Sequence, residues 1–382
     1  MTQRFSLTFA GSFVASILLA APPTSQEQRD AFFNKPQVVK IAIEVGKAES
    51  ESLRKEPRKY VKATVKVGDQ TYKDVGVHLR GAAGSFRGFD DKPGLTLNMD
   101  KFANGQRFHG MEKIHLANSA QDGSYLSELI CGEIFRKADV PAAQIGHAVV
   151  TINGRVRGMY YLKEGYDSLF LQRHFGNSHG NFYDGGFLRE IDQPLELISG
   201  KGDVAGHADL KALVAAANEP DPAKRLARLD KLLELDRFIT YMALEAVLWD
   251  WDSYPFKANN YRVYHNPATG KITFIPSGMD QMFGEVNGPA VPDFGGLVAR
   301  QIMQAPAGKK RYVAKLAEVM KTTYQPEVFV KRLTEMEKVI QPELAKVDEG
   351  AGRNYKNEVN RLRAAIVQRE KTVKAQLKEL RK

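Results

Sequence analysis

Acidic and amide side chains gather in two short stretches of the second half of the chain. Trp249-Asp250-Trp251-Asp252 is followed by Asn259-Asn260, where a predicted helix ends and a predicted hairpin begins, and Asp280 comes just after a predicted strand. Such loops suit a divalent cation with oxygen ligands, because Mg²⁺ is held by one or two carboxylates and completed by phosphate oxygens and water. The equally weighted alternative is that Asp250 and Asp252 only cap a helix or close an Asx turn.

Basic residues form a third group, in the first half of the chain. Arg80 opens a small-residue loop that ends at Ser85, Lys92 follows, and Glu164 ends a later predicted strand. Phosphoryl-transfer enzymes hold nucleotide phosphates with a lysine that a glutamate orients and a flexible loop covers. From these residues alone, solvent-facing cations beside an ordinary turn are the favoured interpretation.

The elements that must position these groups follow from the spacing of apolar residues. Alternation predicts strands over 38–45, 59–67, 73–80 and 94–99, and a hairpin over 147–163 around Asn153-Gly154, so we expect an antiparallel sheet. Helical spacing predicts helices over 125–137, 208–217, 222–235 and 236–248, the last with Asp236 as its N-cap. A second hairpin over 261–276 comes next, and from about Lys309 a charged helical tail follows, broken only near Gly350 to Gly352.

The composition is that of a globular protein. Hydrophobic residues make up 43% and charged residues 26% of 382 residues, which excludes collagen-like, low-complexity and polytopic membrane classes. Lys plus Arg exceed Asp plus Glu by 55 − 45 = 10, an excess that favours anionic partners. The single cysteine, Cys131, rules out an intrachain disulfide and is expected in the core.

The N-terminus has the order of a secretory signal. Arg4 precedes the apolar stretch Leu7 to Ala21, and Pro22-Pro23 follow, with cleavage expected near Ala20 or Ala21. We therefore predict a signal peptide over 1–25, a secreted or periplasmic location, and no membrane span in the mature form.

Six ordered blocks of the chain resemble the CotH family, the spore coat protein H type of secretory kinases. The blocks are His78-Leu79-Arg80-Gly81; Lys92-Pro93; Leu116-Ala117-Asn118 with Asp122; Ile152-Asn153-Gly154 with Gly158-Met159-Tyr160-Tyr161-Leu162 and Glu164; Trp251-Asp252-Ser253-Tyr254 with Asn259-Asn260-Tyr261-Arg262-Val263-Tyr264; and Phe274-Ile275-Pro276 leading to Asp280 and Phe283-Gly284.

The resemblance implies an α+β, bilobal atypical protein kinase-like fold, with a strand-rich N-terminal part, a helix-rich C-terminal part and a helical tail. The kinase-like domain would span 26–308 and the helical extension 309–382. The implied activity is transfer of the ATP γ-phosphate to Ser or Thr of an extracytoplasmic protein, with Mg²⁺ or Mn²⁺.

Roles follow block by block from the same resemblance. Asp252 would be the catalytic aspartate, and Asn260, or its neighbour Asn259, would bind the metal together with Asp280. Lys92 would contact phosphate and Glu164 would orient it. Arg80 would make a further phosphate contact.

Two departures from the family pattern keep other functions open. Ser277-Gly278 stands where the family commonly carries Trp-Asp, and Ala82 to Ser85 replaces an Asn-Ser-Ser type of loop. One alternative is therefore a catalytically impaired binding or scaffold protein at the cell surface. Another is a metal-dependent hydrolase of an extracellular polymer. Nucleic acid is not an expected partner, because Glu residues at helical spacing in the tail favour a helix docked on the body.

Overall fold

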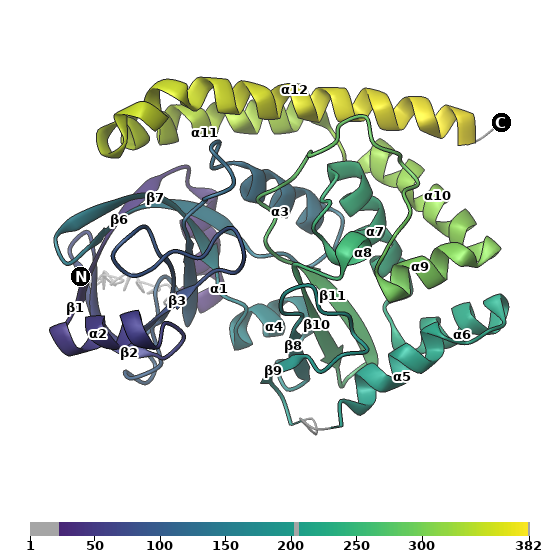
Figure 1. Cartoon of the computed structure of the whole chain (residues 1–382), viewed down its shortest axis with the longest axis horizontal. Coiled ribbons are helices and arrows are strands. Elements are labelled where there is room, and N and C mark those ends of the chain that lie inside the picture. The colour runs from purple at the N-terminus through teal and green to yellow at the C-terminus, as the bar shows by residue number, and fades with distance from the viewer. Residues whose placement is uncertain (1–22, 202–205, 381–382) are drawn as a thin grey trace, which may run out of the picture.

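The computed structural model describes residues 23–201 and 206–380 (Figure 1). The expected cleavage positions, Ala20 and Ala21, and nearly all of the predicted signal peptide lie outside the described residues. Within the described ranges, no helix is both long and apolar enough to cross a membrane.

The first part of the chain forms a closed barrel of seven strands, in the order β1-β2-β3-β4-β5-β7-β6. All neighbouring pairs are antiparallel except β1 and β6, which run parallel and close the barrel. The strands are β1 (Val38–Val45), β2 (Val61–Val67), β3 (Gln70–Arg80), β4 (Gly94–Asn98), β5 (Lys113–Ala117), β6 (Ile145–Ile152) and β7 (Arg155–Glu164).

The predicted strands are therefore confirmed, but the purely antiparallel sheet is wrong. Closing a barrel brings the first strand beside β6, more than one hundred residues later, with Val38 opposite His147. Alternation along a strand shows which face is buried and does not show which strand lies beside it.

The barrel interior is one hydrophobic core, and two helices, α1 (Ser25–Asn34) and α2 (Lys47–Lys55), pack against it. Phe32 and Phe33 of α1 and Leu53 of α2 belong to this core. Thr24 begins α1 with a capping box, because its hydroxyl accepts the amide of Glu27 while the Glu27 carboxylate accepts the amide of Thr24.

The rest of the chain builds a second hydrophobic core from a four-stranded sheet, in the order β11-β10-β8-β9, and from helices. The helix α3, inserted between β5 and β6, packs into this second core. The elements are α3 (Ser127–Lys137), α4 (Ser168–Phe175), β8 (Asn181–Asp184), β9 (Glu196–Ser199), α5 (Ala208–Ala217), α6 (Pro222–Leu232), α7 (Leu235–Leu248), α8 (Tyr254–Lys257), β10 (Tyr261–Asn266), β11 (Lys271–Pro276), α9 (Leu297–Gln304) and α10 (Pro306–Thr322).

The tail is a pair of long helices, α11 (Pro326–Val347) and α12 (Glu349–Leu380), that run side by side across both cores (Figure 1). α11 contacts the barrel strands β1, β6 and β7 and the helix α3, whereas α12 contacts α7 and α10. The predicted break near Gly350 to Gly352 lies instead at Asp348, and a second break, between Thr322 and Pro326, interrupts the tail that was expected to be continuous from about Lys309. Gly352 is inside α12, where a Cβ would stand 2.6 Å from the Cα of Ala345, so the glycine permits the close crossing of the two helices.

The N-cap predicted for the helix over 236–248 is also wrong. α7 begins at Leu235 with Glu234 as its N-cap, and Asp236 instead pairs with Arg311 of α10 at 2.7 Å.

Gly165 directly follows β7, and a Cβ there would stand 2.4 Å from the backbone oxygen of Lys113. We expect Gly165→Ala to lower the free energy of unfolding by about 2 kcal/mol or more, because strand β5 would have to move. Urea denaturation measures the change. Gly88→Ala is the control, since nothing lies within 4 Å of its added Cβ. Equal stabilities of the two variants would contradict this packing.

Candidate active site

A buried ion pair joins the barrel to helix α3. Lys163 of β7 pairs with Glu128 in the first turn of α3, and the two residues are 3% and 2% exposed. Alternation along β7 turns Leu162 into the barrel core and Lys163 outward to the helix. Asp122, which precedes the N-cap Leu126, holds the start of the helix, since its carboxylate accepts the amide of Ser127 at 3.1 Å. The pair is therefore fixed from both elements.

Asp280 lies beside this ion pair. Burial first, and then the negative charge of Glu128, raises the pKa of Asp280 to about 7, while the positive charge of Lys163 acts in the opposite direction. Burial lowers the pKa of Lys163, and the charge of Asp280 partly offsets this effect. Charged residues from a strand, a helix and the loop after β11 are thus near enough to affect one another's pKa.

Arg80 completes the charged group at the end of β3. Burial, followed by repulsion from Arg262, lowers the pKa of Arg80, whereas Glu128 raises it. Among the described residues, no carboxylate forms an ion pair with its guanidinium, while Arg262 pairs with Asp184 at 2.6 Å. A partly buried guanidinium without an acidic partner suits an anionic ligand with several oxygens.

Asp252 is held by the two asparagines that follow it. Its Oδ2 atom accepts a hydrogen bond from Asn259 Nδ2 at 3.0 Å and from Asn260 Nδ2 at 2.9 Å. Because both amides donate to one oxygen, the carboxylate has a fixed orientation. The structure therefore brings together the predicted residues Asp252, Asn259 and Asn260.

The loop that carries Asp280 adjoins these asparagines. The amide of Ser277 donates to the backbone oxygen of Asn260 at 2.9 Å, and the amide of Phe283 donates to that of Leu248 at 2.8 Å. Gly278 has a φ of +69°, and a Cβ there would lie 2.6 Å from Asn260 Oδ1. The glycine that departs from the family pattern is thus required by the close approach of Asn260.

Two buried carboxyl groups lie beneath Asp252. Burial, followed by mutual repulsion, raises the pKa of Glu245 well above its usual range, and burial likewise raises that of Asp250. Asp250 Oδ1 accepts the amide of Asp252 at 3.3 Å. Asp250 therefore shapes the turn that presents Asp252, rather than facing a ligand.

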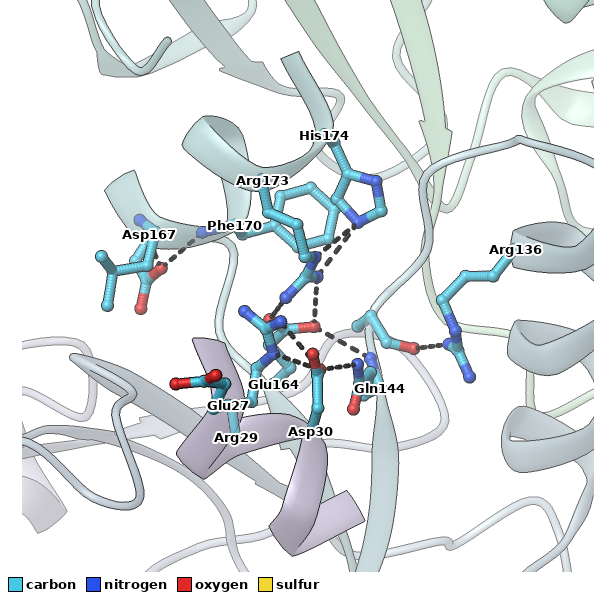
Figure 2. A network of polar contacts seen from close by, with 12 residues as sticks. Glu27, Arg29, Asp30, Arg136, Gln144, Glu164, Asp167, Phe170, Arg173 and His174 are labelled. Carbon is cyan, nitrogen blue, oxygen red and sulfur yellow. Dashed lines mark hydrogen bonds and ion pairs between the residues drawn. The ribbon is translucent and has the colours of Figure 1, made fainter. Parts of the chain in front are cut away.

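The predicted partnership of Lys92 with Glu164 is wrong. Glu164 accepts hydrogen bonds from Arg173 of α4 and lies 3.6 Å from Arg29 of α1, and Figure 2 shows both arginines directed at it. Asp30 and Gln144 extend the same network. Because neighbouring residues of a strand point to opposite faces, Glu164 faces away from the helix that Lys163 meets.

Lys92 packs against two tyrosines. Its Nζ donates to the hydroxyl of Tyr125 at 2.9 Å and lies over the rings of Tyr125 and Tyr160. Burial lowers the pKa of Lys92 to about 8, with the charge of Asp348 opposing. Lys163, which lies between the matched residues Leu162 and Glu164, is the lysine whose charge lowers the pKa of Asp280.

No group of three or more His, Cys, Asp or Glu side chains that could hold a metal ion occurs within 23–201 and 206–380. Asp280 and Asn260 offer one carboxylate and one amide from adjoining loops. This donor set fits Mg²⁺, which takes few protein ligands and completes its shell with phosphate and water.

The family model described as "CotH kinase protein" matches residues 77–373. The chain belongs to the CotH family. The Inner spore coat protein H of Bacillus subtilis is 23% identical over 255 residues, which cover 62% of this chain and 69% of that protein. In this CotH protein, the matched region includes α11 and most of α12, so the tail lies largely within the family's extent.

Two solved structures show more distant likeness. A crystal structure of the Helicobacter pylori proinflammatory kinase CtkA has 9% identity and a TM-score of 0.34, and the match covers 72% of this CotH protein and 94% of that chain. HipA, in a Shewanella oneidensis toxin–antitoxin complex with HipB and operator DNA, has 12% identity and a TM-score of 0.38, covering 79% and 67%. Neither likeness is close enough to define the fold.

The raised pKa of Glu245 has a consequence for stability. In the folded chain the Glu245 carboxyl keeps its proton, whereas in the unfolded chain it releases this proton above about pH 4. The Glu245 carboxyl therefore lowers the free energy of unfolding as the pH rises above about 4. We expect Glu245→Gln to reduce the decrease in the free energy of unfolding between pH 5 and 8, by up to ~1.4 kcal/mol per pH unit. Urea unfolding at several pH values measures this slope, with the exposed Glu349→Gln as control. An unchanged slope in Glu245→Gln would show that the carboxyl is ionised in the fold.

Proposed function

We propose that this CotH protein is a secreted or periplasmic protein kinase that transfers the γ-phosphate of ATP to Ser or Thr of an extracytoplasmic protein, with Mg²⁺ or Mn²⁺. Family membership supports the kinase class. The observation that carries the proposal is the buried Lys163–Glu128 pair, whose charges act on Asp280 and on Arg80, a cation with no ion-pair partner among the described residues. Protein kinases use a strand lysine, a helix glutamate and a metal-binding aspartate in this combination.

The positive groups would bind the triphosphate. In the proposed bilobal arrangement, the barrel is one lobe, the second core is the other, and the triphosphate lies at their boundary. Arg80 offers a planar fork of donors, and Lys163 offers an ammonium that Glu128 keeps in one orientation. Because Lys163 is buried and Arg80 is partly buried, their attraction for phosphate is less screened than that of surface charges.

The acceptor side would be organised by Asp252. Its carboxylate accepts the proton of the substrate hydroxyl, and the amides of Asn259 and Asn260 hold it in place for that step. Asn260 Oδ1 and Asp280 would hold the divalent ion. When bound, that ion neutralises charge on the phosphate oxygens. Positioning and charge neutralisation supply most of the rate in phosphoryl transfer, so few residues suffice.

Asp252 provides the most direct test of activity. We expect Asp252→Asn to lower incorporation of labelled phosphate from ATP by 100-fold or more, because the general base is lost. The assay uses the purified chain with Mg²⁺ or Mn²⁺ and a Ser/Thr-containing test protein. Asp230→Asn, an exposed change on α6, should label as the unaltered chain does.

The same assay decides among the alternatives. Nucleotide binding without transfer would favour an impaired scaffold protein, and cleavage of an extracellular polymer that needs metal but no ATP would favour the hydrolase. Labelling that persists at full rate in Asp252→Asn would dismiss the assignment of the catalytic aspartate.

The choice of lysine has its own test. We expect Lys163→Gln/Glu128→Gln to weaken ATP binding at least tenfold, because a charge-assisted hydrogen bond contributes ~1.5–3 kcal/mol. Replacing both partners avoids leaving one buried charge unpaired. Lys92→Gln should bind ATP within twofold of the unaltered chain. Calorimetric titration measures each affinity, and the reverse ranking would restore Lys92 as the phosphate lysine.

A further inference from the structure

Helix α12 carries a fully buried arginine whose partners are backbone oxygens. Arg369 is 0% exposed, and its guanidinium donates to four carbonyl groups from two separate segments. The acceptors are Ala246 at 2.7 Å, Val247 at 3.1 Å, Val286 at 3.2 Å and Gly288 at 2.5 Å. The cation also lies 5.2 Å from the ring centre of Trp249.

This arrangement is unusual for a charged side chain. Arginine is almost never fully buried unless it is paired, and no carboxylate of the described residues forms an ion pair with Arg369. The carbonyls of Ala246 and Val247 are at the C-terminal end of α7, where the helix dipole places partial negative charge. The guanidinium therefore adds hydrogen bonds to carbonyls at the end of the helix, where the Ala246 oxygen also accepts the amide of Trp249 at 3.3 Å.

The two segments that it joins are those that carry the acids of the site. Ala246 and Val247 directly precede the turn that presents Asp252. Val286 and Gly288 follow the loop that carries Asp280. The planar side chain of Arg369 thus fixes the distance between the two loops.

The same helical pair also contacts the helix that carries Glu128. Arg332 of α11 pairs with Glu133 of α3 at 3.0 Å, one turn beyond Glu128. Since α11 and α12 pack along each other, the pair connects α3 with the two acidic loops. The α11–α12 pair therefore contacts the elements on both sides of the site.

We propose that Arg369 is a positioning residue for phosphoryl transfer, and that the α11–α12 pair is part of the catalytic unit. The inference rests on the proposed function. Arg369 sets the distance between Asp252 and Asp280, whereas Arg80 and Lys163 bind the phosphates independently of it. A lysine cannot replace it, because a single ammonium cannot reach four carbonyls in the planar arrangement of a guanidinium.

Arg369→Lys tests this role, with Arg361→Lys as the matched control on the same helix. Arg361 pairs with Glu358 in solvent, its side chain 74% exposed. Three quantities are compared: the transfer rate, the ATP affinity in EDTA, and acrylamide quenching of tryptophan emission. The chain has two tryptophans, Trp249 and Trp251, so the emission reports on the turn at Asp252 alone. Circular dichroism establishes that each variant is folded.

We expect Arg369→Lys to lose transfer 30-fold or more and to show increased quenching, with ATP affinity in EDTA changed less than threefold. Arg361→Lys should match the unaltered chain in all three. A folded Arg369→Lys with unaltered transfer and quenching would overturn the proposal. So would parallel losses of transfer and ATP affinity, which indicate general loosening of the fold.

Failure of the kinase assignment gives a different pattern. If the unaltered chain transfers no phosphate, the proposed function fails, while quenching and ATP affinity still decide whether Arg369 positions the loop.

A second variant covers the case in which Arg369→Lys does not fold. Gln376→Ala removes neighbouring bonds from α12 to the same segment, from Gln376 Nε2 to the Gly288 oxygen at 3.3 Å and from the Ala290 amide to Gln376 Oε1 at 2.5 Å. We expect at least a threefold loss of transfer and increased quenching with ATP affinity retained. Unaltered transfer and quenching in this variant would overturn the role of the helical pair.

Discussion

The site depends on a pair of opposite charges kept out of water. Removing a lysine and a glutamate from solvent costs several kcal/mol per ion, and their attraction offsets this only when the geometry is good. Lys163 comes from β7, which contributes side chains to both cores, and Glu128 comes from α3 in the second core, so the pair forms only when this strand and this helix are packed together. The pair thereby couples the integrity of the fold to the presence of the site.

The surrounding structure explains how that geometry is maintained. The closed barrel fixes the direction in which Lys163 leaves β7, and Asp122 fixes the first turn of α3. Glu164, one residue further along β7, is bound by Arg173 and Arg29 and anchors the end of the strand. On the other side, Asn259 and Asn260 orient Asp252.

Local patterns made the acidic half of the site predictable from sequence. Asp252 and Asn260 are eight residues apart, and Asp280 follows the hairpin that starts beside them, so spacing alone brings them near one another.

Lys163 was not found, because its burial results from packing between distant elements. Glu128 gave no signal either, since Ser127 to Gly132 are buried on every side of the helix, and the helical spacing does not show that an acid among them is buried. The family resemblance instead implied Lys92 as the phosphate lysine and Glu164 as its partner, and Glu164 is the strand neighbour of Lys163 and faces the opposite way. The closure of the barrel by β1 and β6 could not be predicted from sequence either, because the packing of the whole chain determines which strands pair.

A crystal structure with a non-hydrolysable ATP analogue and Mg²⁺ would test the account most directly, through the distances from the lysine ammonium groups to the phosphate oxygens. The account predicts Lys163 Nζ and the Arg80 guanidinium within about 3 Å of phosphate oxygens, with Asp280 on the metal. A triphosphate bound at Lys92, with the Lys163–Glu128 pair remote from the nucleotide, would contradict it.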